Sequence, residues 1–327
     1  MRRYRPKFLQ DGVLVVNKPA GPTSHDVVDR LRRRFRPAKL GHTGTLDPFS
    51  NGVLVLAFNR ATRLTGLLGA GAKLYRGRLA LGEATDTGDP TGQVVEQAPV
   101  PELNREQAQQ AVASLVGERL QAPPAFSAVK HQGRPLYAYA RQGRKVEKPP
   151  RPVTVYEAEL VELGSDWLVF DLRCSRGTYV RTLGEDLAQQ LGTVGHLSAL
   201  TRLASEPFHL EEAAALEEVL DWDPAELKRR LLDPSTALER CGLPAVSLDE
   251  DRVWELRQGR ILRREVLLKD AAGPGELGQP FRVLSPQGEL VAVLRWLGPG
   301  EARPDRDYET IRVFPELPRE RLAGEAE

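Results

Sequence analysis

The sequence predicts an α+β protein of two domains, and three observations support this. Its 327 residues correspond to about two domains of roughly 150 residues each. Apolar runs typical of strands are interspersed with segments whose apolar residues recur at helical spacing. After Cys241 the pattern changes to short strands separated by glycine and proline. We therefore expect a larger domain at 1–241 and a small β-rich domain at 242–327, ending in a short tail.

In the first 120 residues, each expected element follows from a local pattern. The apolar run 12–17 predicts a buried strand that ends at Lys18-Pro19. Ser24 is a favourable N-cap for a helix at 24–35, whose apolar side chains then lie on one face. A glycine-rich loop at 41–52 follows. The remaining elements expected here are a strand at 53–58, a helix at 61–68, an alternating strand at 74–81 and a helix at 106–116.

The middle of the chain begins with a segment of unusual composition. Residues 121–153 are rich in proline, arginine, lysine and aromatic residues, which indicates an excursion from the core. One short helix is expected in it, at 136–142. Beyond the excursion we expect strands at 153–163 and 167–174, a helix at 179–191, a strand at 197–203 and acidic helical segments to Arg240. Short strands at 281–284, 289–296 and 310–314 complete the β-rich domain.

Several protein classes are excluded by composition. The chain contains no run of 18 uncharged apolar residues, so no transmembrane helix is predicted. Its basic start is not followed by a secretory signal pattern. Cys174 and Cys241 form no metal-binding pattern and no disulfide framework. We therefore expect a cytoplasmic protein with no bound metal and no membrane contact.

Charge is distributed unevenly, although the net charge is +1. Residues 1–40 carry 11 Lys or Arg against 3 Asp or Glu, and residues 121–153 carry 7 against 1. Residues 211–251 carry 4 against 12. Of the 46 basic residues 37 are arginine, which favours phosphate contacts and base stacking, although codon usage explains this bias equally well. The segregation of charge is typical of a protein that binds a polyanion.

The loop GHTGTLDP at 41–48 carries the sharpest chemical signal. Pro48 restricts the backbone of Asp47 to extended conformations and so limits the direction of its carboxylate. Glycines at positions 41, 44 and 52 allow the loop to approach another molecule closely. Taken alone, an Asp-Pro pair is more often an ordinary turn. The rest of the chain decides whether Asp47 lies in an ordinary turn or in a functional site.

The chain resembles the bacterial tRNA pseudouridine-55 synthases, the TruB-type family, over nearly its whole length. Six segments carry the resemblance in the family's order: DGVLVVNKPAGPTSHDVV, GHTGTLDPFSNGVLVL, KLYRGRLALGEATDTGD, PPAFSAVKHQGRPLYAYARQG, RCSRGTYVRTLGEDLAQQLG and HLSALTR. It implies the pseudouridine synthase fold, a mixed, mainly antiparallel sheet flanked by helices. It also makes residues 242–327 similar to a PUA-type RNA-binding domain, although no motif there is specific.

The resemblance implies an activity and its central residues. The family isomerises uridine 55 in the T loop of tRNA without a cofactor: uracil is detached from its ribose, rotated and rejoined through C5. Asp47 takes the role of the nucleophile, which requires an ionised carboxylate with a fixed approach. The sequence does not distinguish attack on C1′ of the ribose from attack on C6 of the base. Arg181, near the start of a helix where the dipole disfavours a cation, becomes the ion-pair partner of Asp47.

Four further positions receive roles by the same resemblance. Tyr75 is expected to stack on the target base and is a candidate to take the proton from C5, and Tyr179 is expected to line the pocket. His42 is placed beside the flipped nucleotide, and Leu200 offers backbone groups to the uracil edge. Without the resemblance, composition favours two core tyrosines, a turn histidine and a core leucine.

RNA contact is expected to come mainly from the excursion. A base stacked in a folded RNA loop must be flipped out, and aromatic stacking offsets that cost. The basic and aromatic excursion is the natural clamp on the RNA, with Lys130, Arg134, Arg141 and Arg144 as candidate backbone contacts. We expect the partner to be the T arm of tRNA and the protein to be a monomer.

The sequence argues against two other functions. A non-catalytic RNA chaperone on the same fold is disfavoured because Asp47, Tyr75 and Arg181 are all present. A zinc deaminase is excluded because the chain has no H-x-E motif followed by P-C-x-x-C. The chain departs from the pattern of many family members at Asn51 and Phe126, neither of which carries an expected role.

Overall fold

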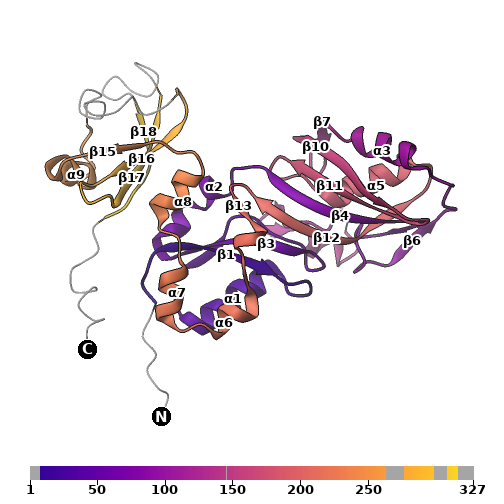
Figure 1. Cartoon of the computed structure of the whole chain (residues 1–327), viewed down its shortest axis with the longest axis horizontal. Helices are drawn as coiled ribbons and strands as arrows, with labels where there is room; N and C mark the ends of the chain where they lie inside the picture. Colours follow the sequence, from indigo (N-terminus) through magenta and orange to yellow (C-terminus); the bar gives the residue numbers. More distant parts are fainter. Residues whose placement is uncertain (1–7, 145, 263–275, 298–307, 316–327) are drawn as a thin grey trace, which may run out of the picture.

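The computed structural model describes residues 8–144, 146–262, 276–297 and 308–315. Its main feature is a ten-stranded sheet with the path β14-β1-β3-β12-β4-β11-β10-β7, to which β13 and β2 add at the side (Figure 1). The strands are β1 (Gly12–Lys18), β2 (Leu40–His42), β3 (Asn51–Phe58), β4 (Lys73–Leu81), β7 (Gly117–Gln121), β10 (Arg151–Leu163), β11 (Trp167–Cys174), β12 (Gly195–Ser205), β13 (Phe208–His209) and β14 (Ala214–Ala215).

The pairing in this sheet is mixed and mainly antiparallel, which confirms the expected fold class. Along the path, β1 with β14 and β3 with β12 are parallel, and the remaining pairs are antiparallel. The expected strands 12–17, 53–58, 74–81, 153–163, 167–174 and 197–203 all lie in this sheet within a few residues of their predicted bounds. Continuous apolar runs and alternating patterns together therefore located the sheet correctly.

Two helices pack against the sheet near β4, β10 and β12. The helices α3 (Arg105–Ala113) and α5 (Val180–Gln190) contact the sheet at β10, β12 and β4, and Figure 1 shows them together on one side. The core between these helices and the sheet includes Leu79, Phe170 and Leu183, all fully buried. Gly77 leaves room for this packing, since a Cβ there would lie 2.9 Å from the Phe170 ring.

The helix α1 (Ser24–Phe35) has the predicted length, but its predicted cap is wrong. Thr23, not Ser24, is the N-cap: its hydroxyl accepts from the Asp26 amide at 3.0 Å, and the Asp26 carboxylate accepts from the Thr23 amide at 2.8 Å. This reciprocal capping box outweighs a lone serine. Ser24 is instead fully buried and bonds to a distant loop.

Several elements differ from the sequence-based expectation. The helix expected at 61–68 is a 3-10 helix η1 (Asn59–Leu64) followed by α2 (Thr65–Leu68). The expected acidic helical segments are η2 (Leu210–Glu212), α6 (Leu216–Asp221), α7 (Pro224–Arg230) and α8 (Pro234–Arg240). Elements that were not predicted include β2, β7, β13, β14, the hairpin β5 (Glu83–Thr85) with β6 (Val94–Gln97), and α9 (Glu250–Arg257).

The excursion between β7 and β10 has its own small elements. It contains β8 (Lys130–His131), β9 (Arg134–Pro135) and the short helix α4 (Leu136–Ala140), near the helix expected at 136–142. Tyr139 is buried there and its hydroxyl donates to the His131 carbonyl at 3.1 Å. The last rung of the β7–β10 ladder, Gln121 opposite Arg151, marks where the excursion leaves the sheet.

The C-terminal part of the described chain forms a separate four-stranded sheet, β15-β16-β17-β18, beside α8 (Figure 1). Its strands are β15 (Ala245–Ser247), β16 (Pro280–Leu284), β17 (Leu290–Trp296) and β18 (Tyr308–Val313), which include most of the expected positions. The buried Arg282 donates to the Leu243 carbonyl at 2.9 Å and to the Ser235 carbonyl at 3.1 Å. The expected tail at the end of the chain lies outside the described residues. The proposed boundary near residue 242 stays a prediction.

Candidate active site

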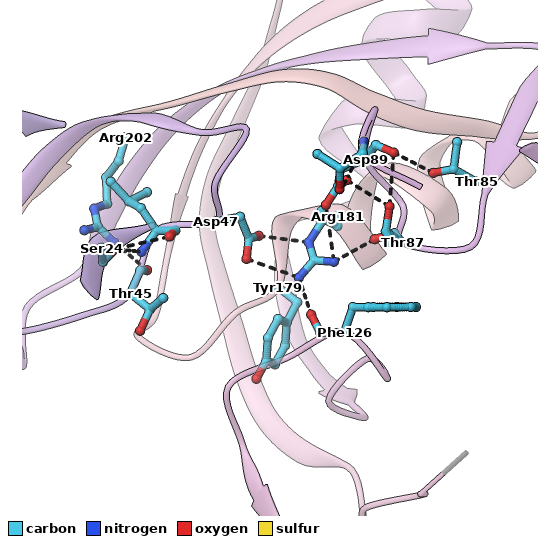
Figure 2. A network of polar contacts seen from close by, with 12 residues as sticks. Ser24, Thr45, Asp47, Thr85, Thr87, Asp89, Phe126, Tyr179, Arg181 and Arg202 are labelled. Atoms are coloured by element: carbon cyan, nitrogen blue, oxygen red, sulfur yellow. Dashed lines mark hydrogen bonds and ion pairs between the residues drawn. The ribbon is translucent and has the colours of Figure 1, made fainter. Parts of the chain in front are cut away.

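The loop that carries Asp47 is held in place by hydrogen bonds from two buried side chains. The Arg202 guanidinium, from β12, donates to the carbonyls of Val53, Thr45 and Gly44 at 2.7, 3.2 and 3.2 Å. Ser24 accepts from the Leu46 amide at 2.8 Å and donates to the Leu46 carbonyl at 3.1 Å. A charged group and a hydroxyl brought from distant parts of the chain thus fix the backbone directly before Asp47 (Figure 2).

Asp47 and Arg181 form a two-pronged ion pair (Figure 2). Arg181 Nε lies 2.9 Å from one carboxylate oxygen and Nη2 lies 3.4 Å from the other. The Arg181 side chain is 4% exposed, whereas that of Asp47 is 34% exposed. The arginine is therefore part of the protein interior, and the carboxylate is the member of the pair that a substrate can reach.

Arg181 is fixed on its other side by groups from two further segments. Nη1 donates to the Thr87 carbonyl at 2.6 Å, and Nη2 donates to the Phe126 carbonyl at 2.8 Å. A second carboxylate, Asp89, lies 3.6 Å from Nη1 and is itself buried. Because a guanidinium carries its donors in a rigid plane, these contacts determine the direction that it presents to Asp47.

Asp89 is held by the turn in which it lies. Its Oδ1 accepts from the Thr87 hydroxyl at 2.8 Å and from the amide and hydroxyl of Thr91 at 2.9 and 2.5 Å. The Asp89 carbonyl accepts from the buried Thr85 hydroxyl at 2.8 Å. The segment between β5 and β6 thus supplies a structured support for Arg181.

The electrostatics of Asp47 are set by opposing effects. Burial raises the pKa of its carboxyl and nearby Asp89 adds to this, while Arg181 and Lys18 act in the opposite direction. The net effect raises the pKa of Asp47 above its ordinary value.

Lys18, at the end of β1, is fully buried and donates to the carbonyls of Pro22 and Pro19 at 2.7 and 2.9 Å. Burial lowers the pKa of Lys18 to about 8.

The shift at Asp47 predicts a pH dependence for any reaction that needs the Asp47 carboxylate. Its pKa lies above the ordinary 3.8, so the rate falls as the pH drops through the raised pKa. We expect single-turnover rates at saturating substrate to decline with a midpoint above 3.8. A rate that stayed constant down to that pH, in protein shown to be folded by circular dichroism, would contradict the assignment.

Tyr75 and Leu200 lie in one buried cluster with the loop residue Leu46. Tyr75 is 8% exposed, on β4, and Leu200 is 6% exposed, on the neighbouring β12. Burial raises the pKa of the Tyr75 hydroxyl, and nearby Arg202 opposes this. The structure thus brings Tyr75 and Leu200 together next to the Asp47 loop.

Tyr179 and His42 lie at the edges of this site. Tyr179 is the N-cap residue of α5, two positions before Arg181, and burial raises the pKa of its hydroxyl. Figure 2 shows its ring below Arg181, on the side of Phe126. His42 lies at the end of β2, and burial together with Arg202 lowers its pKa. Its buried Nδ1 has no hydrogen-bond partner among the described residues.

The comparisons with known proteins decide the family. Residues 32–180 match the TruB family pseudouridylate synthase (N terminal domain), and residues 181–239 match the tRNA pseudouridylate synthase B C-terminal domain. The tRNA pseudouridine synthase B of Geobacter sulfurreducens is 41% identical over 306 residues, which are 93% of this chain and 99% of that protein. The chain belongs to the TruB family. The tRNA pseudouridine synthase B of Syntrophotalea carbinolica is 39% identical and covers 93% of this chain and 98% of its own.

Solved structures show the same fold for this TruB-family chain. A chain of a Cbf5-Nop10-Gar1 complex superimposes with a TM-score of 0.67 at 23% identity, covering 96% of this chain and 90% of that chain. A chain of an H/ACA RNP bound to a substrate RNA containing 2′-deoxyuridine gives a TM-score of 0.68 at 24% identity, covering 94% and 86%. At this level of identity the likeness concerns the architecture alone.

The four candidate clamp residues lie on the excursion and not at the ion pair. Arg141 stacks on the Tyr137 ring at 5.5 Å, and Arg134 and Arg144 lie 6.0 and 5.5 Å from the Tyr139 ring. Lys130 is exposed on β8. One backbone group of the excursion does reach the site, because Phe126 accepts from Arg181. The TruB-family site is therefore physically joined to the root of the excursion.

Sequence reasoning missed four residues that build the site: Lys18, Ser24, Asp89 and Arg202. Lys18 and Arg202 are buried cations whose partners are backbone carbonyls, and neither periodicity nor charge patterning predicts such contacts. For Asp89 a signal existed, since threonine and aspartate alternate in TDTGDPT, a composition typical of side chains that bond to their own turn. No group of three or more His, Cys, Asp or Glu that could hold a metal occurs among the described residues.

Proposed function

We propose that this TruB-family enzyme converts uridine 55 in the T loop of tRNA to pseudouridine, with Asp47 as the nucleophile. The observation that carries the proposal is the ion pair of Asp47 with the buried Arg181, at 2.9 Å, on the loop held by Arg202. A carboxylate that is reachable, fixed in direction and paired with an immobile cation is the arrangement that covalent catalysis requires.

The reaction is an isomerisation in which every atom of the nucleotide is retained. The C1′–N1 glycosidic bond breaks and a C1′–C5 bond forms. The proton on C5 is lost and N1 gains one, so no electrons are transferred and no cofactor or metal is needed. Tyr75, buried beside the loop, stacks on the base, and its hydroxyl oxygen receives the C5 proton as the hydroxyl gives up its own proton. Arg181 favours the ionised form of the carboxylate and so opposes the effect of burial.

The substrate must present its uridine outside the RNA stack. The clamp on the excursion, with Lys130, Arg134, Arg141 and Arg144, contacts the T arm, and His42, Tyr179 and Leu200 surround the flipped nucleotide. Arginines already stacked on Tyr137 and Tyr139 present preorganised planes with positive charge, which suits RNA loops with splayed bases. The enzyme acts as a cytoplasmic monomer.

No helix within the described residues is both long and apolar enough to cross a membrane.

A direct product assay tests this function. Purified enzyme is incubated with an unmodified tRNA transcript, and pseudouridine is mapped at single-nucleotide resolution, with a transcript carrying cytidine at position 55 as the control. We expect pseudouridine at position 55 and at no position of the control. Accelerated tRNA folding without any pseudouridine would overturn the proposal in favour of a non-catalytic RNA chaperone.

We also propose that the part of the chain after residue 242 adds RNA affinity without building the pocket. Removing residues 242–327 is expected to weaken tRNA binding and to leave the single-turnover rate at saturating tRNA within about threefold of normal, since distant contacts raise affinity alone. The midpoint of thermal unfolding should also fall. Val293 and Phe314 pack in one buried cluster with Leu238 and Val13, and that cluster would become exposed. A folded truncation whose saturated rate drops a hundredfold would contradict this division.

A further inference from the structure

Gln121 makes an unusual pair of hydrogen bonds with a single residue of the site. Its Oε1 accepts from the backbone amide of Tyr179 at 2.7 Å, and its Nε2 donates to the backbone carbonyl of Tyr179 at 3.0 Å. Gln121 is 6% exposed. The two bonds require a side chain that accepts at one atom and donates at another, as an amide does.

Tyr179 occupies a position where such support matters. It is the N-cap of α5, and its own side chain makes no capping hydrogen bond. Its carbonyl also accepts from the Leu183 amide at 3.3 Å, within the first turn of α5. The Gln121 amide therefore satisfies the backbone amide of the N-cap residue, and it holds both peptide groups that flank Tyr179, where the helix carrying Arg181 begins.

The other end of the connection between β11 and α5 is fixed separately. The Ser175 amide donates to the Thr154 carbonyl at 2.8 Å, and the Ser175 hydroxyl accepts from the Thr154 amide at 2.9 Å. Between the two anchors lies Gly177, in the left-handed region at φ 85°. Gln121 thus holds the site end of this connection, opposite the sheet end that Ser175 and Thr154 fix.

Gln121 also stands at the root of the excursion. It is the last residue of β7 and pairs with Arg151, the first residue of β10. Five residues further along, the Phe126 carbonyl accepts from Arg181 Nη2 at 2.8 Å. The first residues of the excursion therefore contact the site twice, once at the start of α5 and once at the Arg181 guanidinium.

We propose that Gln121 is a positioning residue for catalysis. Through its bonds to the Tyr179 backbone it fixes the positions of Tyr179 and Arg181 and connects them to the first residues of the excursion. This inference rests on the proposed function for its kinetic test. It differs from a stabilising role in what it predicts, because the loss falls on the rate of the bound complex rather than on RNA affinity.

The first test removes both hydrogen bonds while retaining side-chain length. Gln121→Met is expected to lower the single-turnover rate at saturating tRNA about tenfold or more, with the Kd for tRNA within about threefold of normal. Gln97→Met is the matched control: Gln97 is an exposed glutamine on β6 that bonds only to Glu83 among the described residues, and its rate should not change. Weaker tRNA binding with a normal saturated rate would overturn the proposal.

A second variant keeps the proposal testable if the methionine variant does not fold. In Gln121→Glu, an ionised carboxylate accepts from the Tyr179 amide but cannot donate to the Tyr179 carbonyl. Protonation restores a donor, and a buried carboxyl facing a carbonyl oxygen has a raised pKa. We expect the ratio of variant to normal rate to rise about threefold or more between pH 8 and pH 5.5. A ratio that stays flat across this range would contradict the proposal.

Hydrogen exchange provides a readout that does not depend on activity. Peptides that cover Tyr179 to Leu183 should exchange faster in Gln121→Met than in the normal protein, whereas peptides from α3 should be unchanged. If the normal enzyme made no pseudouridine, the proposed function would fail while this measurement still tested the positioning. Unchanged exchange at the start of α5 would show that Gln121 does not hold it.

Discussion

Replacing Asp47 by asparagine should abolish pseudouridine formation while tRNA binding stays within a few-fold of normal. The amide is nearly isosteric with the carboxylate and its oxygen still accepts from Arg181, so the pocket keeps its shape. An amide is, however, not a competent nucleophile, and the loss falls entirely on the chemical step. Single-turnover rates and equilibrium binding of the same transcript separate the two quantities.

The control for this variant is an aspartate outside the site. Asp166 is exposed in the turn between β10 and β11, and Asp166→Asn should have normal rates and normal binding. Product formed by purified Asp47→Asn at even a tenth of the normal rate would exclude Asp47 as the nucleophile. A large loss of affinity, with the protein folded, would show instead that the carboxylate acts in recognition.

The elements that sequence predicts best are the strands whose apolar residues pack in the core. β1, β3, β4 and β11 were located within one or two residues, because each has a continuous or alternating set of apolar residues that the core requires. β6 was missed because all four of its residues are exposed, so no burial pattern distinguishes it from a turn. α9 was missed for a related reason, since it buries only Val253 and Leu256.

The capping of α1 shows a different kind of limit. Thr23 and Ser24 are both good N-cap residues, and only the reciprocal bond from Asp26 selects Thr23. Ser24 is then free to bond with Leu46 on both its amide and its carbonyl. A one-residue difference in the helix start thus changes a presumed cap into a support of the loop that bears Asp47.

The site follows the same division between local pattern and distant contact. The resemblance proposed Asp47 and Arg181, and the structure places them together. The groups that hold them are backbone carbonyls of Thr87 and Phe126, which approach from different turns of the chain. Residue types alone carry no information about a backbone acceptor. Such contacts can be identified only from the folded structure, in which the sheet brings these turns to one end of α5.

Replacing Arg181 by lysine should lower the single-turnover rate about a hundredfold or more, because an ammonium cannot reproduce the planar set of contacts. Arg181 serves Asp47, the Thr87 carbonyl and the Phe126 carbonyl at the same time, with Asp89 at 3.6 Å. A lysine keeps the charge but can satisfy only part of this set. The side chain is almost fully buried, so water does not replace the missing donors.

The pH profile separates positioning from charge in this variant. If charge alone mattered, Arg181→Lys would retain most of the rate, and the acid limb of its profile would coincide with that of the normal enzyme. We expect instead a large loss at every pH, together with an acid limb shifted to higher pH, because a less well-placed cation opposes the burial of Asp47 less effectively. Arg105→Lys, at the exposed start of α3, is the control and should behave normally. A lysine variant within tenfold of the normal rate would show that the guanidinium geometry is not what the reaction requires.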